Sequence, residues 1–205
     1  MAYDQLASDV SINTTLDGLA KRNIEGMVVS SKVEAMEKIK ELIPAGGSVM
    51  NGSSTTLEQI GFVDYLKNGK HGWNNLHEDI VAEKDPAKQG MLRKQAVLSD
   101  YYLGSVHALA ETGEFVIASN TGSQLPHVVF TSPNLIFVVG AQKIVPTLTD
   151  ALKRLEEYVI PLEDIRSRKA YGVGTNPNKI VIFKGENPMI GRKVRLIVVK
   201  EVLGF

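Results

Sequence analysis

Short apolar runs that alternate with helix-start patterns constrain the fold of this chain more than any other feature. Residues 24–29 and 48–51 have the length and character of strands, and a helix pattern follows each of them. Apolar strands separated by helices are typical of a parallel sheet that is buried on both faces. The alternation therefore predicts an α/β fold with a central, largely parallel sheet and helices on both sides, a three-layer sandwich.

Helix starts are marked by residues that satisfy free backbone N–H groups. The segments Ser31–Glu34 and Thr55–Glu58 have the capping-box pattern, in which a hydroxyl and a carboxylate accept from those groups. Pro86 predicts a long helix over 86–103, because proline at the first helical position removes no required hydrogen bond. The other expected segments are a helix over 3–22, a helix ending near residue 43, one ending near residue 69, one starting at Pro146, and exposed loops over 70–85 and 166–179.

The second half of the chain is richer in strand patterns. Strands are expected over 107–110, 115–119, 135–140, 180–183 and 195–200. Such density near the C-terminus indicates antiparallel strands, at an edge or in a small added sheet. A length of 205 residues fits one large α/β domain, so residues 1–205 are expected to form a single domain.

Composition excludes several classes of function. Lys and Arg total 23, as do Asp and Glu, so the net charge is zero and no general field attracts nucleic acid. The absence of cysteine excludes disulfides, thiolate catalysis and thiolate metal sites. The four histidines have no ligand spacing, so no metal site is expected. With no signal peptide and no apolar run long enough to cross a bilayer, a cytoplasmic protein without membrane contact is expected.

A glycine turn with four hydroxyl residues follows the strand pattern at 48–51. Ligands of open α/β sheets bind where strands end, and a helix start there offers N–H groups and partial positive charge to an anion. The alternative is that the hydroxyls only cap the helix, since the segment lacks the lysine of a P-loop. The candidate anion-binding residues of this segment are Asn51, Gly52, Ser53, Ser54, Thr55 and Thr56.

An acidic turn, Glu111-Thr112-Gly113, joins two apolar runs. Glu111 is at an expected strand end, where a carboxylate facing a cleft can act as acid, base or nucleophile. It is the candidate catalytic residue, with Thr112 and Gly113 as candidate ligand contacts. The simpler alternative is a hairpin turn with solvated glutamates.

A small polar loop follows the strand pattern at 115–119. Asn120, Thr121 and Gly122 have the amide, hydroxyl and backbone groups to orient a ligand, and His127 borders the loop. An ordinary turn is the alternative. We expect this loop, the hydroxyl turn near Gly52 and the acidic turn near Glu111 to surround one pocket at the strand ends.

Four stretches of the chain together resemble the LUD domain (lactate-utilisation) family, which includes the C-type lactate-utilisation protein. They are residues 51–57, 99–113, 138–146 and 198–205. The resemblance implies a fold like that of the NagB/RpiA/CoA-transferase superfamily. There, a glycine-hydroxyl loop after a strand holds a phosphate or other anion, and class I coenzyme A transferases use a glutamate before a glycine-containing turn. The short segments 51–56 and 111–113 are similar to these.

The resemblance implies an accessory protein in organic-acid (L-lactate) oxidation that binds a small anionic metabolite and works with iron–sulfur partner proteins. Many short LUD relatives have cysteines before the last strands, whereas segment 172–178 has none, so a redox role tied to them does not carry over. One alternative is an enzyme acting on a sugar phosphate or acyl-CoA thioester with Glu111 as base or nucleophile. Another is a non-catalytic interaction domain with residues 70–85 as the contact. The residues alone decide neither catalysis, cofactor, ligand nor homo-oligomer formation.

Overall fold

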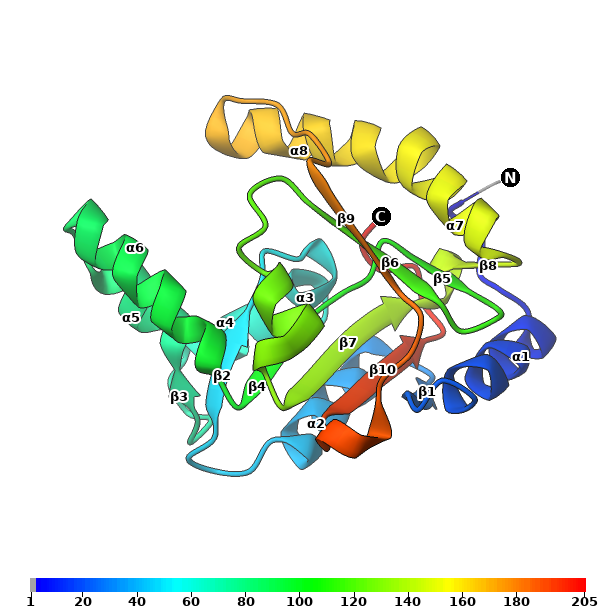
Figure 1. Cartoon of the computed structure of the whole chain (residues 1–205), viewed down its shortest axis with the longest axis horizontal. Coiled ribbons are helices and arrows are strands. Elements are labelled where there is room, and N and C mark those ends of the chain that lie inside the picture. The colour runs from blue at the N-terminus through cyan, green and yellow to red at the C-terminus, as the bar shows by residue number, and fades with distance from the viewer. Residues whose placement is uncertain (1–2) are drawn as a thin grey trace.

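The computed structural model of the protein describes residues 3–205, which form two sheets and eight α-helices (Figure 1). The larger sheet has six strands in the order β1-β10-β7-β4-β2-β3, and every neighbouring pair is parallel. The expected α/β class with a largely parallel sheet is therefore confirmed. Its strands are β1 Glu25–Val29, β2 Ser48–Asn51, β3 Asn74–Asn75, β4 Tyr101–Gly104, β7 Asn134–Gly140 and β10 Lys193–Val199.

The smaller sheet has four strands in the order β8-β5-β6-β9. They are β5 Ala108–Ala110, β6 Phe115–Ser119, β8 Ile144–Val145 and β9 Lys179–Phe183. β6 pairs antiparallel with both β5 and β9, so β9 is an antiparallel strand near the C-terminus, as expected. β10 instead lies between β1 and β7 in the parallel sheet, because its apolar side chains are buried on both faces.

The central strand β7 shows how the core is divided. Leu135, Phe137 and Val139 pack with the smaller sheet and α1, whereas Ile136 and Val138 pack with helices on the opposite face. A strand buried on both faces produces this alternation, and it accounts for the continuous apolar run in the sequence. The helices are α1 Asp9–Ala20, α2 Lys32–Leu42, α3 Thr55–Gln59, α4 Phe62–Lys67, α5 Leu76–Ala82, α6 Pro86–Gln95, α7 Leu148–Arg154 and α8 Ile160–Tyr171.

Different helices pack on the two sheets. Residues of α2, α3 and α4 cover one face of the parallel sheet, and α7 packs on the smaller sheet. α5 lies against β2 and pairs with α6, which stands out from the body of the molecule (Figure 1). Within residues 3–205, no helix has the length and apolar character needed to span a membrane.

Capping side chains mark the observed helix starts, and some of these starts differ from the positions that the sequence predicts. Ser31 Oγ accepts from the Glu34 N–H at 3.3 Å, and the Glu34 carboxylate accepts from the Ser30 N–H at 2.9 Å, so this capping box is confirmed. The next helix begins one residue earlier than expected, with Ser54 as its cap, and Gly61 divides it into α3 and α4. The expected helices over 3–22 and from Pro146 begin later, at Asp9 and Leu148.

The predicted surface loop over 70–85 is wrong. The segment contains β3 and α5. The side chain of Asn75 caps α5 by accepting the His77 N–H at 3.2 Å. Trp73 is 9% exposed, lies near Phe62 and Tyr65, and donates its indole N–H to the Ile43 carbonyl at 3.1 Å. The tryptophan is therefore part of the core.

Two further expectations are corrected. The helix predicted over 86–103 ends at Gln95, where a short 3-10 helix, Ala96–Leu98, follows, and Tyr101–Leu103 belong to strand β4 between β2 and β7. The loop predicted over 166–179 begins only after α8 ends at Tyr171. In both places long-range pairing or packing outweighs the local pattern.

Candidate functional site

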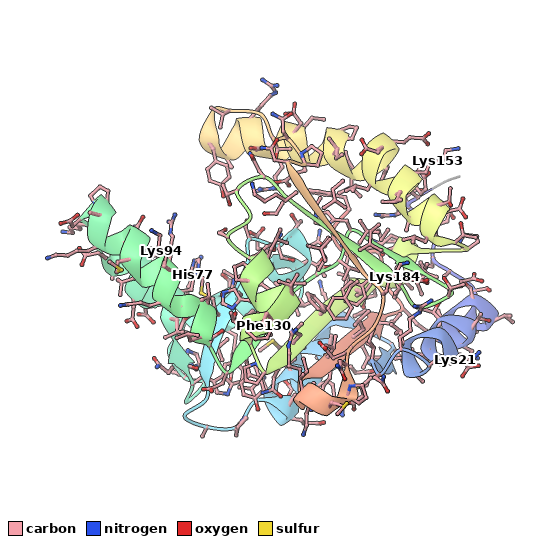
Figure 2. The ribbon with its side chains drawn as sticks, in the orientation of Figure 1. Lys21, His77, Lys94, Phe130, Lys153 and Lys184 are labelled. Carbon is pink, nitrogen blue, oxygen red and sulfur yellow. The ribbon has the colours of Figure 1, made fainter. Side chains whose placement is uncertain are left out.

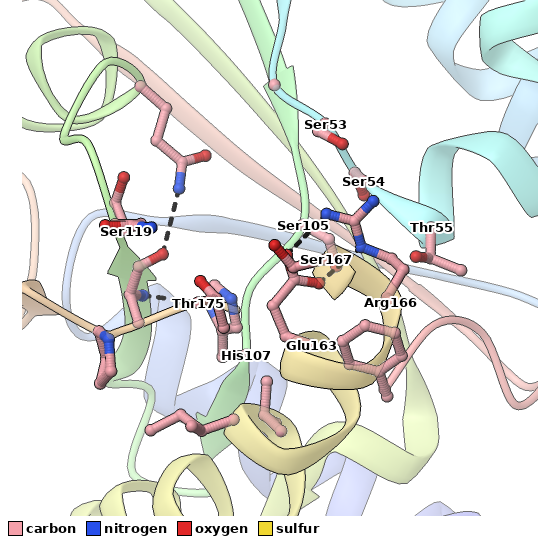
Figure 3. Close-up of a pocket in the computed structure, with 18 of the residues that line it drawn as sticks. Ser53, Ser54, Thr55, Ser105, His107, Ser119, Glu163, Arg166, Ser167 and Thr175 are labelled. Carbon is pink, nitrogen blue, oxygen red and sulfur yellow. Dashed lines mark hydrogen bonds and ion pairs between the residues drawn. The ribbon is translucent and has the colours of Figure 1, made fainter. Parts of the chain in front are cut away.

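A cleft of about 550 Å3 opens where three strands of the parallel sheet end (Figure 3). The turn after β2, the segment Ser105–His107 after β4 and Lys143 after β7 form one side. The loop after β6, helix α8 and the segment 173–177 form the other. Carboxyl ends of parallel strands are where open α/β sheets bind their ligands.

Lys143 lies at the buried end of the cleft and is 2% exposed. Its ammonium donates to Thr56 Oγ1 at 3.1 Å, to Ser105 Oγ at 3.1 Å and to the Val106 carbonyl at 3.3 Å. All three acceptors are neutral, and no carboxylate within residues 3–205 forms an ion pair with it. Burial, together with a smaller effect of the nearby charge of Arg154, lowers the pKa of Lys143 to about 7.

The two hydroxyls hold this ammonium in one position. Ser105 donates its own proton to the Val138 carbonyl at 2.7 Å, and Thr56 donates to the Leu203 carbonyl at 3.4 Å. Each oxygen is therefore an acceptor toward Lys143. The arrangement orients a cation at the strand ends without neutralising it.

His107 adds a neutral donor to the cleft. Its Nδ1 accepts the Ala118 N–H at 3.1 Å, so the proton of the neutral ring is on Nε2. Nε2 has no hydrogen-bond partner in the described part of the chain. Burial lowers the pKa of His107 to about 3, with further contributions from the charges of Lys143 and Arg154. At neutral pH the ring is therefore uncharged.

Helix α8 brings a guanidinium to the exposed side of the cleft. Arg166 donates to Glu163 from Nε at 2.7 Å and from a terminal nitrogen at 2.6 Å, and this ion pair raises its pKa. Figure 3 shows the guanidinium extending from α8 toward the side of the cleft that bears Ser53, Ser54 and Thr55. Arg93 of α6 also lines the cleft.

The polar loop after β6 is held by its neighbours. Ser119 Oγ accepts from the Gly122 N–H at 3.0 Å, and Asn120 Oδ1 accepts from the Asn178 side chain at 2.8 Å. Gln124 accepts from the Tyr102 hydroxyl at 3.0 Å and donates to the Ala118 carbonyl at 3.2 Å. The loop is thus fixed against both sheets as one wall of the cleft.

The structure brings together only part of the residue set expected from the sequence. The members that line the cleft are Gly52, Ser53, Ser54, Thr55, Thr56, Asn120 and Thr121. The members that do not line it are Asn51, Glu111, Thr112, Gly113, Gly122 and His127.

The acidic turn does not meet the hydroxyl turn, contrary to expectation. β5 and β6 form a hairpin, so the turn at 111–113 lies at the end opposite to His107 and Ser119. Glu111 accepts from Ser11 Oγ at 2.5 Å, and Arg22 donates to the Thr112 carbonyl at 2.6 Å. The turn packs on α1, outside the cleft.

His127 is an interior residue that is 2% exposed. Its ring stacks on Tyr102 with 4.5 Å between centroids, and Nδ1 lies 2.8 Å from Ser132 Oγ. Burial lowers its pKa to about 4. Asn51 is also buried, with its side chain donating to the Gly52 carbonyl at 3.2 Å. Asn51 thus contacts Gly52 of the cleft lining, and Tyr102, on which His127 stacks, donates to Gln124 of the same lining.

Sequence reasoning missed the principal charged residue of the cleft. Lys143 interrupts an apolar stretch directly after the strand pattern at 135–140, and a lysine there is a usable signal. The expected contribution of the helix start is reduced, because α3 has only five residues. Ser54 does cap it, accepting the Leu57 N–H at 3.3 Å, so the capping role and the cleft position coexist.

Comparisons with known proteins agree on the type of domain. A family model described as LUD domain matches residues 12–187. Among solved structures, the chain is similar to a DUF162 family protein from Deinococcus radiodurans, whose crystal structure has 1.70 Å resolution. That match has a TM-score of 0.58 and 14% identity, and covers 95% of this chain and 99% of the other, so it shows a shared fold. No curated protein matches the sequence.

Proposed function

Because the chain belongs to the LUD domain family, and so is generally of the lactate-utilisation type, we propose that it binds a small anionic metabolite as an accessory protein in L-lactate oxidation. The observation that carries this proposal is the buried ammonium of Lys143, which lies in the cleft and forms no ion pair with a carboxylate of residues 3–205. A buried charge without a partner is costly, and a bound anion offsets that cost.

The groups around Lys143 suit an oxyanion. The ammonium supplies the charge, while the Nε2–H of His107 and the side-chain amide of Asn120 supply donors without further charge. The three N–H groups of the ammonium already donate to Thr56, Ser105 and Val106, so Lys143 attracts the anion through its charge, and the carboxylate is expected at the Lys143 end of the cleft.

We assign electron transfer to other proteins. Oxidation of a hydroxy acid removes electrons, and this chain has no cysteine with which to hold an iron–sulfur cluster. Iron–sulfur partner proteins would then accept the electrons, while this chain holds the anion. No cofactor is assigned to it.

The alternative of an enzyme with Glu111 as base or nucleophile receives no support from the geometry, since Glu111 faces Ser11 rather than the cleft. Its substitution is therefore a useful control. Glu111→Gln is expected to leave anion binding unchanged, and a loss of binding would restore Glu111 as a site residue.

The affinity for carboxylates should fall as pH rises above 7. Lys143 attracts an anion to the inner end of the cleft only when it is protonated, and its pKa is about 7. Well above that value each pH unit should therefore weaken binding about tenfold, and between pH 7, where half of Lys143 is protonated, and pH 9 the loss should be about fiftyfold. His107 and His127 titrate far below this range, at about 3 and 4. Calorimetric titration with L-lactate and succinate at both pH values measures the change, and a constant affinity would contradict the proposal.

The accessory role itself is tested by growth. A strain lacking this protein should fail to grow on L-lactate as carbon source and should recover with the wild-type chain. Lys143→Met is not expected to restore growth, whereas Glu111→Gln is. Normal growth of the deletion strain on L-lactate would exclude the proposed role.

A further inference from the structure

The cleft has an excess of positive charge that a single small acid would leave unused. Its lining contains the cationic side chains of Arg93, Lys143 and Arg166, and Glu163 has the one carboxylate side chain among its described lining residues. With His107 neutral, the lining side chains carry a charge of two positive units (three cations less one carboxylate), although the side chains of the whole chain sum to zero. A cleft lined by one sign of charge concentrates ligands of the opposite sign.

These cations lie at two depths. Lys143 is buried where β7 ends, whereas Arg166 of α8 is 29% exposed and Arg93 of α6 is exposed. Arg93 forms no ion pair within residues 3–205. Lys143 thus provides an ammonium at the inner end, and the two arginines provide guanidinium donors nearer to solvent, where Arg166 donates Nε and one terminal nitrogen to Glu163 and keeps its other terminal nitrogen for a ligand.

The size of the cleft also indicates a ligand larger than a single small acid. A volume of about 550 Å3 is within the range that holds drug-sized ligands, and it greatly exceeds the space needed by a three-carbon acid. Apolar side chains of Leu155, Val159 and Ile160 also line it. They provide contact for a carbon skeleton that connects two polar ends.

We propose that the cleft binds a dianion whose charged groups are several bonds apart, with a carboxylate at Lys143 and a second carboxylate or a phosphate at Arg93 and Arg166. This inference rests on the proposed anion-binding function and specifies its ligand class. L-Lactate alone occupies only the inner position and binds more weakly than the dianion.

Calorimetric titration at pH 6.5 compares L-lactate with straight-chain dicarboxylates from malonate to adipate and with 3-phosphoglycerate. At least one dianion should bind about tenfold or more tightly than L-lactate, the effect of one added charge-assisted contact. The dicarboxylates report the preferred spacing. Comparison of 3-phosphoglycerate with the dicarboxylates reports whether the outer position prefers phosphate or carboxylate.

Two sets of variants locate the second charge. The double variant Glu163→Gln/Arg166→Gln removes the guanidinium without changing the net charge of the cleft, and Arg93→Gln removes the other outer cation. Both should weaken dianion binding about tenfold or more and leave L-lactate binding unchanged. Lys94→Gln removes a cation from the neighbouring position on α6, outside the cleft lining, and should change neither (Figure 2).

The outcomes separate this inference from the proposed function. If L-lactate binds as tightly as every dianion, or if the arginine variants weaken both ligands equally, the two-ended ligand is excluded while anion binding at Lys143 stands. If Lys143→Met retains wild-type affinity for every probe, the proposed function itself fails. Absence of binding by any probe to the wild-type protein would overturn both.

Discussion

Replacement of Lys143 by methionine is expected to weaken anion binding at pH 7 by about a hundredfold or more while the protein stays folded. Methionine has a similar length and no charge, so it can fill the buried space left by the lysine side chain. The variant loses the charge that attracts the anion but keeps the hydroxyls of Thr56 and Ser105. Calorimetric titration measures the affinity, and circular dichroism verifies the fold.

The wild type and this variant should differ in how their stability depends on pH. The pKa of Lys143 falls from 10.5 in the unfolded chain to about 7 in the folded protein. Between these values the unfolded chain binds more protons, so the free energy of unfolding of the wild type rises with pH. Below pH 7 the residue is charged in both states, and the full cost of its burial is present.

Lys143→Met lacks this titration. From pH 7 to about 10 the difference in free energy of unfolding should therefore shift in favour of the wild type by about 1.4 kcal/mol per pH unit. Urea denaturation at pH 7 and 9 measures it. The matched control is Lys153→Met on α7, which removes a side chain that is 58% exposed (Figure 2). Identical behaviour of the two variants would show that Lys143 is not a buried, titrating cation.

Gly113→Ala is expected to lower the free energy of unfolding by about 2–5 kcal/mol, the sum of backbone strain and overpacking. Gly113 has φ of 93°, and an added Cβ would lie 2.4 Å from the carbonyl carbon of Gly18 in α1. Neither the turn nor the helix backbone can move away without loss of the packing between them. For a protein of this size the change corresponds to a fall in Tm of about 5–15 °C.

Gly46→Ala separates the two causes. Gly46 has φ of 81°, but an added Cβ would have no atom within 4 Å. This control should show only the strain of a left-handed backbone, about 1–2 kcal/mol. If Gly113→Ala costs no more than Gly46→Ala, the contact with α1 is not tight. Anion binding by the folded Gly113→Ala protein should equal that of the wild type, because the turn lies outside the cleft.

These contacts give the acidic turn a structural role. Glu111 accepts from Ser11, Arg22 donates to the Thr112 carbonyl and pairs with Glu114, and Gly113 packs on Gly18. A turn that attaches the first helix to the hairpin needs a carboxylate and a glycine just as a catalytic turn would. The sequence pattern is therefore the same for both roles, and only the surroundings distinguish them.

The features that the sequence determined by itself depend on residues that are close to one another along the chain. The apolar run at 135–140 predicts a strand buried on both faces, and Ser31 with Glu34 predicts a helix start; both are present. The hydroxyl turn at 52–56 was placed correctly at a strand end. Strand periodicity, capping and turn chemistry act over a few residues, so one short segment contains all the residues that produce such a feature.

Only the tertiary structure decided which segments meet. Lys143 acquires its role from Thr56 and Ser105, which lie 87 and 38 positions away along the chain. Their proximity follows from the adjacent positions of β2, β4 and β7 in the sheet, whereas the hairpin of β5 and β6 directs Glu111 away. The strand order depends on burial of the apolar surface of the whole chain, not of one segment. As a consequence of this order, Lys143 lies in the cleft and the acidic turn lies on α1.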